Sequence, residues 1–175
     1  MGWSPRRTCT TVTASVAERT ELTRRLAVAA DHAGAALKAQ LIAKIATIAP
    51  EWSAIDLGGD GSDPTDDYPD SARAVAESML RGDAERGLLI CGSGIGVTIA
   101  ANKFKGIRAS IAHDAASADQ GVVHDAMNVL SLGAKVVDVD TAARAVAAFL
   151  AAEPSPEERF VRRTRKVAKI EEEQG

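Results

Sequence analysis

The stretch Gly87-Leu-Leu-Ile-Cys-Gly-Ser-Gly-Ile-Gly96 decides the fold of this chain. Its first part, Gly87–Cys91, is apolar without alternation, which is typical of a strand buried on both faces of a parallel sheet. The glycines that follow predict a tight turn, because glycine adopts backbone conformations that other residues avoid. An apolar helix is expected to run from this turn through Asn102. The stretch therefore predicts a strand, a glycine-rich loop and a helix, in that order.

The same alternation of strand and helix patterns continues on both sides of this stretch. Apolar residues at helical spacing, such as Leu37, Leu41 and Ile45, predict helices between short apolar runs that predict strands. Such alternation indicates parallel βαβ units, so we predict an α/β fold with helices on both faces of one five-stranded sheet. The predicted strands are 26–30, 52–57, 87–91, 107–112 and 128–132, and the predicted helices are 37–48, 72–80, 141–152 and 157–173, with shorter ones through Asn102 and through Ala118.

The domain organisation follows from the length and the pattern. The chain has 175 residues, enough for one domain with a tail at either end. We expect residues 1–25 to be a loosely ordered N-terminal extension, because no regular pattern precedes Leu26. Residues 26–153 are expected to form the α/β domain, and residues 154–175 a basic C-terminal helix that follows the break at Pro154 and Pro156.

Composition excludes several classes of function. The net charge of −3 provides no general attraction for nucleic acid. With only 3% aromatic residues, the chain has few side chains on which nucleic-acid bases could stack. No apolar run approaches the roughly 20 residues that span a bilayer, so we expect no membrane association. The two cysteines, Cys9 and Cys91, are too few for a disulfide framework. A reducing, cytoplasmic location is therefore expected.

Candidate site residues follow the predicted strands. In an open parallel sheet, ligands bind beyond the carboxyl ends of the strands. The residues found there are Asp31 and His32 after the first strand, 66–68 after the second, 91–96 after the third, and His113 and Asp114 after the fourth. The histidines lack metal-ligand spacing, so acid–base or phosphate-binding roles are favoured over a metal site.

Cys91 allows two interpretations, because it ends the third strand at the start of the glycine loop. Backbone N–H groups there favour an oxyanion or a phosphate, and they favour a thiolate that acts as nucleophile or base. A small buried core residue fits the same position equally well. The loop is not a P-loop, because no Gly-Lys-Ser/Thr follows, and it fits Gly-x-Gly-x-x-Gly poorly. A nucleotide- or flavin-binding protein is therefore the weakest of the hypotheses.

The final helix carries the one basic cluster, 159–169. Arg162 and Lys166 are four residues apart, so they share a helix face and are candidates to clamp a phosphate. The alternative is a solvated helix face, balanced by the glutamates at 171–173.

Taken together, these motifs resemble the type B ribose-5-phosphate isomerase family, which includes the subunits of galactose-6-phosphate isomerase. The resemblance extends from about residue 26 to about residue 170. Its motifs are Ala30-Asp-His-Ala-Gly34, Asp67-Tyr-Pro69, Leu89-Ile-Cys-Gly-Ser-Gly-Ile-Gly-Val-Thr-Ile-Ala-Ala-Asn-Lys103, Gly106-Ile-Arg-Ala109, Asn128-Val-Leu130 and Leu132-Gly-Ala-Lys-Val136.

The resemblance implies a Rossmann-like α/β/α fold that interconverts aldose and ketose phosphates through an enediol. It implies a homodimer or homotetramer whose active sites are shared between subunits, with the C-terminal helix packed on the partner, and with no metal or cofactor. By the same likeness, Cys91 is the general base, because Val97 stands where some members carry a glutamate base. Ser93 and the loop amides would stabilise the enediolate. His124 would open the sugar ring with help from Asp31.

The substrate-binding residues are implied by the same resemblance. Those expected along the sugar are Tyr68, Gly92, Gly94, Gly96 and Asp125, and those expected at the phosphate are His32, Lys135, Arg162 and Lys166.

Some positions depart from the common pattern of the family. Lys135 and Lys166 stand where arginine is common, and lysine lacks the bidentate fork of arginine. Asp125 stands where asparagine is common, and Ala126 and Met127 also differ. These changes keep the reaction class but leave the sugar open. Ribose 5-phosphate is the leading substrate, and a tetrulose 4-phosphate, a hexose 6-phosphate or a non-catalytic phosphosugar-binding subunit are the alternatives.

Overall fold

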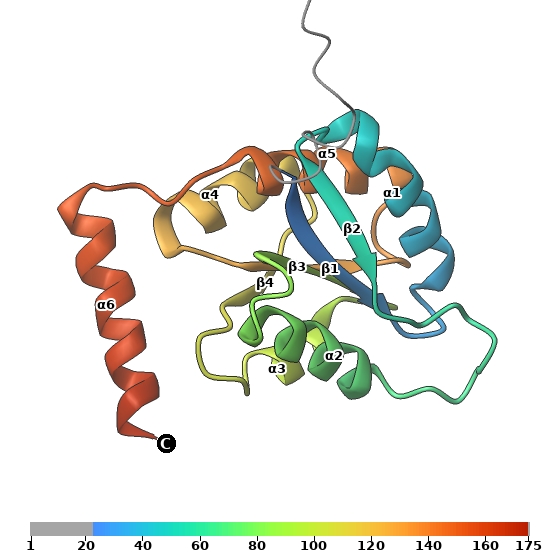
Figure 1. The fold of residues 1–175 in the computed structure, drawn as a ribbon, viewed down its shortest axis with the longest axis horizontal. Helices are drawn as coiled ribbons and strands as arrows, with labels where there is room; N and C mark the ends of the chain where they lie inside the picture. The colour runs from blue at the N-terminus through green and yellow to red at the C-terminus, as the bar shows by residue number, and fades with distance from the viewer. Residues whose placement is uncertain (1–22, 175) are drawn as a thin grey trace, which may run out of the picture.

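The computed structural model describes residues 23–174, so the expectation for residues 1–22 lies outside the described part (Figure 1). Five strands and six helices alternate along these residues. All the strands pair in parallel, in the order β2-β1-β3-β5-β4. The strands are β1 (Arg24–Ala30), β2 (Trp52–Asp56), β3 (Arg86–Cys91), β4 (Ala109–Ile111) and β5 (Val129–Gly133), and the helices are α1 (Ala35–Ile48), α2 (Tyr68–Leu80), α3 (Ile95–Ala101), α4 (Ala115–Asp125), α5 (Val139–Ala151) and α6 (Glu158–Glu173).

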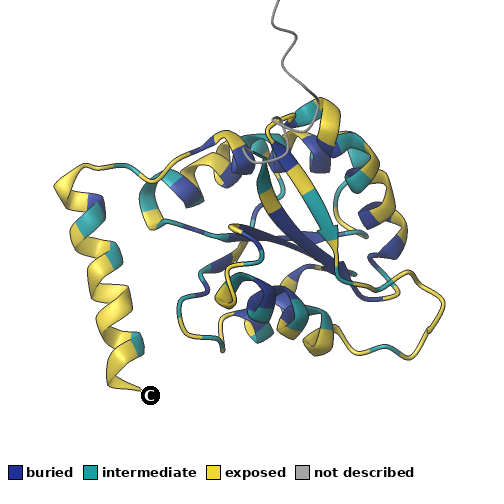
Figure 2. Ribbon diagram, viewed as in Figure 1, coloured by how far each residue is buried: buried dark blue, intermediate teal, exposed yellow. Residues whose placement is uncertain are grey.

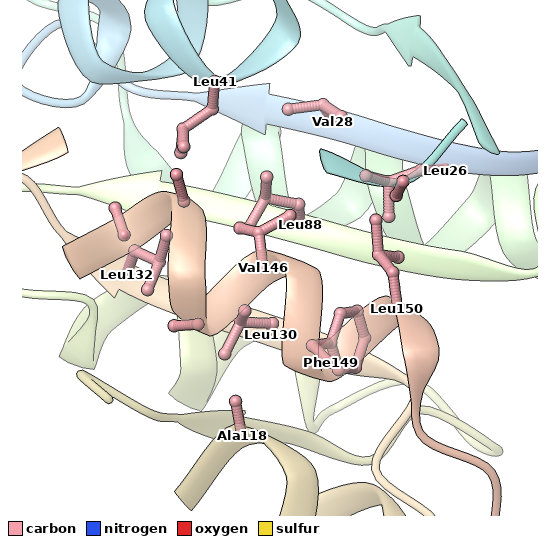
Figure 3. Close-up of a cluster of buried hydrophobic side chains, with 14 of the residues drawn as sticks. Leu26, Val28, Leu41, Leu88, Ala118, Leu130, Leu132, Val146, Phe149 and Leu150 are labelled. Carbon is pink, nitrogen blue, oxygen red and sulfur yellow. The ribbon is translucent and has the colours of Figure 1, made fainter. Parts of the chain in front are cut away.

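Two apolar cores lie on the two faces of the sheet. Successive residues of a strand point to opposite faces, so β1 contributes Leu26 and Val28 to one core and Ala27 and Ala29 to the other. Helices α1, α4 and α5 cover the first core, and α2 and α3 cover the second. Figure 3 shows the first core, where Phe149 of α5 lies among the side chains of the sheet. The predicted Rossmann-like α/β/α layers and five-stranded parallel sheet are therefore confirmed.

The sheet begins earlier than the sequence predicted. β1 starts at Arg24 rather than Leu26, so residues 24 and 25 belong to the domain and not to the extension. Arg24 is fixed there because its guanidinium donates to Glu85 at 2.9 Å and to Glu153 at 2.7 Å. The same group lies 4.2 Å from the centre of the Trp52 ring. From their charge, Arg24 and Arg25 were expected to belong to the polar extension. In the structure, their side chains bind groups from other parts of the domain at the end of the sheet.

β4 is shorter and α4 is longer than predicted. β4 comprises only Ala109–Ile111, because the Ile107 N–H donates to the Phe104 carbonyl in a turn. α4 continues beyond Ala118 to Asp125, because Val122 faces the same core and favours further turns of helix. The helix consequently starts at the carboxyl edge of the sheet, where β4 ends, and finishes at the amino edge, where β5 begins.

Helix α6 extends away from the domain at one end of the molecule (Figure 1). Phe160 is its buried residue, and most of its other residues are exposed (Figure 2). Glu171 accepts a hydrogen bond of 2.9 Å from the Gly106 N–H. A cavity of about 600 Å³ lies between α6, the β4 edge and the end of α4, and residues such as Arg108, Met127 and Val167 line it. Within residues 23–174, no helix is both long and apolar enough to cross a membrane.

Phe149 is the largest fully buried side chain, with 0% of its surface exposed. We expect Phe149→Ala to lower the free energy of unfolding by about 3–5 kcal/mol, because the change removes apolar contacts and leaves a cavity. Urea denaturation monitored by circular dichroism measures the change. Leu80→Ala is the control, since Leu80 is 56% exposed, and it should cost less than about 1 kcal/mol. An unfolding midpoint of Phe149→Ala equal to the parental one would contradict the assigned core.

Candidate active site

Cys91 lies at the carboxyl end of β3, on the face covered by α2 and α3. Its side chain is buried, and the Gly94 N–H points at the sulfur with a nitrogen–sulfur distance of 3.1 Å. This N–H is available because Gly94 has a φ of +83°, a conformation that favours glycine. A backbone N–H directed at sulfur stabilises negative charge on it. The geometry is thus suited to a thiolate that takes up and returns a proton.

The glycine loop is supported by the chain that follows β5. The Ala134 N–H donates to the Cys91 carbonyl at 2.8 Å, and the Lys135 N–H donates to the Gly92 carbonyl at 3.0 Å. These bonds extend the β3–β5 pairing past the strand ends. They bring the Lys135 side chain beside Gly92, where a Cβ would lie only 3.7 Å from the lysine Cε. A cationic side chain therefore lies next to the loop.

Asp31 lies beside Cys91, because Ala30 and Ile90 are paired in the β1–β3 register. The Asp31 N–H donates to the Ile90 carbonyl, and its carboxylate accepts from the Gly34 N–H at 3.0 Å. Asp31 is 8% exposed, so it is nearly buried at this edge of the sheet. Gly34 permits the close approach of α1 to β3, since a Cβ there would lie 2.4 Å from the Ile90 carbonyl oxygen.

His32 is paired with Asp66 from the connection between β2 and α2. The carboxylate oxygen accepts from the His32 ring nitrogen Nδ1 at 2.7 Å and from its backbone N–H at 2.8 Å. The hydrogen bond and the charge of Asp66 raise the pKa of His32 above its usual value. The exposed imidazole is thus favoured in its cationic form at the open edge of the site.

Tyr68 stands at the start of α2 and lies against the glycine loop. Its ring is so close to Gly96 that a Cβ on this residue would lie 2.9 Å from two ring carbons. Tyr68 is 42% exposed, so the other part of the ring faces outward. Ser93 is also exposed, and its Oγ accepts from the Ile95 N–H at 3.3 Å. Tyrosine and serine hydroxyls therefore border the same loop.

The other predicted site residues lie elsewhere in the chain. His124 and Asp125 end α4 at the amino edge of the sheet, opposite to Cys91. The His124 ring stacks on Phe160, with ring centroids 4.2 Å apart and planes 9° from parallel. Arg162 and Lys166 are exposed on α6, which Figure 1 shows far from the connection between β2 and α2. One chain therefore carries the predicted site as two separate groups of residues.

We call these groups the base group and the cap group and keep both names below. The base group, at the carboxyl edge, comprises Asp31, His32, Tyr68, Cys91, Gly92, Ser93, Gly94, Gly96 and Lys135. The cap group, at the amino edge and on α6, comprises His124, Asp125, Arg162 and Lys166.

A model of the ribose/galactose isomerase family matches residues 26–170, which is nearly all of the described chain. This chain belongs to the ribose/galactose isomerase family. It is 41% identical over 133 residues to D-erythrulose-4-phosphate isomerase 2 of Mycolicibacterium smegmatis, which covers 76% of this chain and 88% of that protein. It is 39% identical over 130 residues to ribose-5-phosphate isomerase B of Escherichia coli, a match that covers 74% of this chain and 85% of that protein.

Solved structures of this isomerase family have the same fold. The type B ribose 5-phosphate isomerase of Trypanosoma cruzi superposes with a TM-score of 0.83 at 35% identity, covering 87% of this chain and 99% of that one. The ribose-5-phosphate isomerase B of Mycoplasma genitalium, solved with bound ribulose-5-phosphate, gives a TM-score of 0.79 at 34% identity. This match covers 87% of this chain and 99% of that one.

Sequence reasoning missed two residues that shape the base group of this isomerase. Asp66 was noted only as part of a strand-end segment, and nothing in its spacing showed that it reaches His32. Lys38 is 3% exposed, and its Nζ donates to the Asp56 carboxylate and to the Gly58 carbonyl. The sequence held one indication of this role, because Lys38 follows Leu37 on the face of the predicted helix that was expected to be buried. Lys38 thereby anchors the start of the connection that carries Asp66.

His113 is the strand-end histidine that the isomerase family resemblance did not assign. It follows β4, and its Nε2 is buried without a hydrogen-bond partner among the described residues. Across residues 23–174, no cluster of three or more histidine, cysteine or acidic side chains is arranged to hold a metal ion.

Proposed function

We propose that this protein interconverts ribose 5-phosphate and ribulose 5-phosphate through an enediol. The observation that carries the proposal is the placement of Cys91 beside Asp31, with the Gly94 N–H of the glycine loop directed at its sulfur. Proton abstraction next to a carbonyl needs a base, donors for the oxyanion and restricted access of water. The buried thiol and the loop amides supply these within one turn of chain.

In this mechanism, the Cys91 thiolate takes the proton from C2 of the open-chain aldose. The electron pair of that C–H bond forms the C1–C2 double bond, and the carbonyl π electrons move to O1. The resulting oxyanion is stabilised by loop N–H groups and by Ser93. The proton of Cys91 then returns to C1, and the O2 proton is transferred to the O1 oxyanion, so that O1 becomes a hydroxyl as the C2 carbonyl forms. No oxidant or added group is needed, because the atoms of substrate and product are the same.

The charged side chains of the base group suit a phosphorylated sugar. Lys135 supplies a positive charge, and the carboxylate of Asp66 raises the pKa of His32 and so favours its cationic form. Both residues lie at the open edge around the loop. A phosphate dianion bound there would place the other end of a short sugar near Cys91. Arg162 and Lys166 are the residues of the cap group that would bind the phosphate. They can do so only if the cap group lies next to a base group.

The two groups of site residues support a homodimer with shared active sites. Since one chain holds them at opposite edges, a second copy can place its cap group over the first chain's base group, and a two-fold axis then completes two equal sites. Apolar side chains are exposed beside the loop, notably Ile95, Ile99 and Val136. Burying them on a partner would favour association. In this arrangement α6 packs on the partner subunit, and two such dimers can form a tetramer.

A shorter sugar is the second candidate substrate. The relative from Mycolicibacterium smegmatis is named for D-erythrulose 4-phosphate, and it is as similar to this chain as the pentose-phosphate isomerases are. Asp125 would add a carboxylate near the sugar hydroxyls, which changes the hydroxyl pattern that the site accepts. We place the enzyme in the cytoplasm, because a thiol base depends on a reducing environment.

Incubating the purified protein with ribose 5-phosphate and following ribulose 5-phosphate tests the proposal. We expect turnover with kcat of about 1–10³ s⁻¹, the usual range for enzymes. D-erythrulose 4-phosphate and a hexose 6-phosphate are assayed beside it at equal concentration. Preference for either one would keep the isomerase reaction but replace the substrate. Binding of all three without turnover of any would instead identify a non-catalytic phosphosugar-binding subunit.

A further inference from the structure

We propose that Asp66 is a positioning residue that keeps His32 a hydrogen-bond donor to the substrate phosphate across the neutral pH range. The inference rests on the proposed function for the presence of a phosphate, and it adds a residue to which no role had been assigned. It starts from the two hydrogen bonds that a single carboxylate oxygen of Asp66 accepts from His32.

These two bonds fix the tautomer of the imidazole. A carboxylate only accepts hydrogen bonds, so the proton of the ring lies on Nδ1, at 2.7 Å from Asp66. The free ring position is Nε2, which makes no hydrogen bond within residues 23–174, and the side chain is 44% exposed. Asp66 therefore directs Nε2 to the open side of the site.

The charge on the ring then decides what Nε2 can bind. In the neutral ring, Nε2 presents a lone pair, which repels the acceptor oxygens of a phosphate dianion. In the imidazolium, Nε2 carries a proton and donates a charge-assisted hydrogen bond. Phosphate binding thus needs the protonated ring, and a neighbouring carboxylate favours that form.

The charged groups that act on His32 among the described residues are acidic. Asp66 is the first of these causes, with its side-chain hydrogen bond, and Asp31 acts through its charge alone. Asp63 also lies within electrostatic range of the ring, and hydrogen bonds from Thr65 lower the pKa of Asp63, which keeps it ionised. These carboxylates come from the end of β1 and from the connection between β2 and α2.

Asp66 is held in place by its own loop rather than by His32 alone. Asp63 accepts from the Thr65 backbone at 2.8 Å and from its hydroxyl at 2.6 Å, which forms a turn directly before Asp66. At the other end of the loop, Lys38 binds Asp56 and the Gly58 carbonyl. The connection that carries Asp66 is therefore held by hydrogen bonds of its own at both ends.

The test compares Asp66→Asn with the parent protein. The asparagine oxygen can accept the same two hydrogen bonds, so the change removes the charge while keeping the geometry. Titration of ¹⁵N-labelled histidines by NMR, with His32 assigned from a His32→Gln spectrum, reports the pKa of His32 directly. We expect this pKa to fall toward about 6.5 in Asp66→Asn. Asp70→Asn removes the same charge from the first turn of α2 and should leave the titration unchanged.

Kinetics provide the second readout. The ratio of KM in Asp66→Asn to KM in the parent cancels the ionisation of the substrate phosphate itself. We expect a ratio near one at pH 6 that rises severalfold by pH 8, with kcat changed by less than about twofold, because the parent keeps a larger protonated fraction of His32 as the pH rises. A purely structural role would raise the ratio equally at every pH.

Inorganic phosphate serves as the probe that does not depend on turnover. At pH 7.5 it should shift the His32 signals of the parent, and this shift should be lost or weakened in Asp66→Asn. An unchanged His32 pKa in Asp66→Asn, or an undiminished phosphate response, would overturn the proposal. If instead the parent turns over no sugar phosphate while the NMR results hold, the proposed function fails and the role of Asp66 stands.

Discussion

Replacing Cys91 by alanine should remove isomerisation almost completely. We expect kcat to fall by about 10²–10⁴-fold, the contribution typical of a positioned general base, because the variant has no group at this place to accept the C2 proton. KM should change little, since the cations His32 and Lys135 remain beside the loop. The measurement is the conversion of ribose 5-phosphate, or of the preferred substrate, by the parent and the variant under identical conditions.

Cysteine controls separate loss of the base from loss of the fold. Cys91→Ser keeps the size of the buried side chain but offers a weaker base, so its kcat should also be low. Cys9→Ala removes the other cysteine of the chain and should leave kcat unchanged. Parental turnover in Cys91→Ala would show that another residue moves the proton, and it would return Cys91 to the alternative interpretation of a small core residue.

The second large effect is the recovery of activity by mixing two inactive chains. Cys91→Ala disables the base group, and His124→Phe disables the cap group while keeping a ring to stack on Phe160. In a mixed dimer, one of the two shared sites combines an intact base group with an intact cap group. Random pairing of equal amounts should therefore restore about a quarter of the parental activity, counted as intact sites.

A same-edge pair provides the control for this experiment. Cys91→Ala and Asp31→Ala both damage the base group, so their mixture leaves no intact site and should stay inactive. The mixtures are prepared by co-expression or by refolding together, and their turnover is compared with that of each chain alone. Failure of the Cys91→Ala and His124→Phe mixture, with mixed dimers demonstrated by mass spectrometry, would contradict the shared site.

The fold was predictable because each strand and helix carries its own pattern. The run Gly87–Cys91 is buried throughout, as expected for a central strand, and β3 indeed lies between β1 and β5. Element ends were predicted less well, since they depend on tertiary contacts. Arg24 enters the sheet because Glu85, Glu153 and Trp52 surround its guanidinium, and these residues are distant in sequence.

The site was predictable only as far as the strand-end rule and the family motifs reach. That rule placed Asp31, His32 and Cys91 at one edge of the sheet, and the structure has them there, at the ends of the neighbouring strands β1 and β3. It could not indicate that Asp66 pairs with His32, which depends on how the connection between β2 and α2 folds back. His124 lies at the amino edge of the sheet because α4 continues to Asp125. The sequence predicted that this helix ends at Ala118, so it did not indicate where His124 lies.

The division of the site between two edges of the sheet has a consequence for the evolution of such a protein. If the sites are shared, each site is formed by the base group of one chain and the cap group of the other. A pair of chains then contains each group twice. After a gene duplication, one copy can lose its base group and the other its cap group, yet the heteromeric pair retains one complete site. With shared sites, specialised two-gene enzymes can therefore arise from this architecture by loss alone, and a substitution on α6 would be subject to selection through the chemistry of the neighbouring chain.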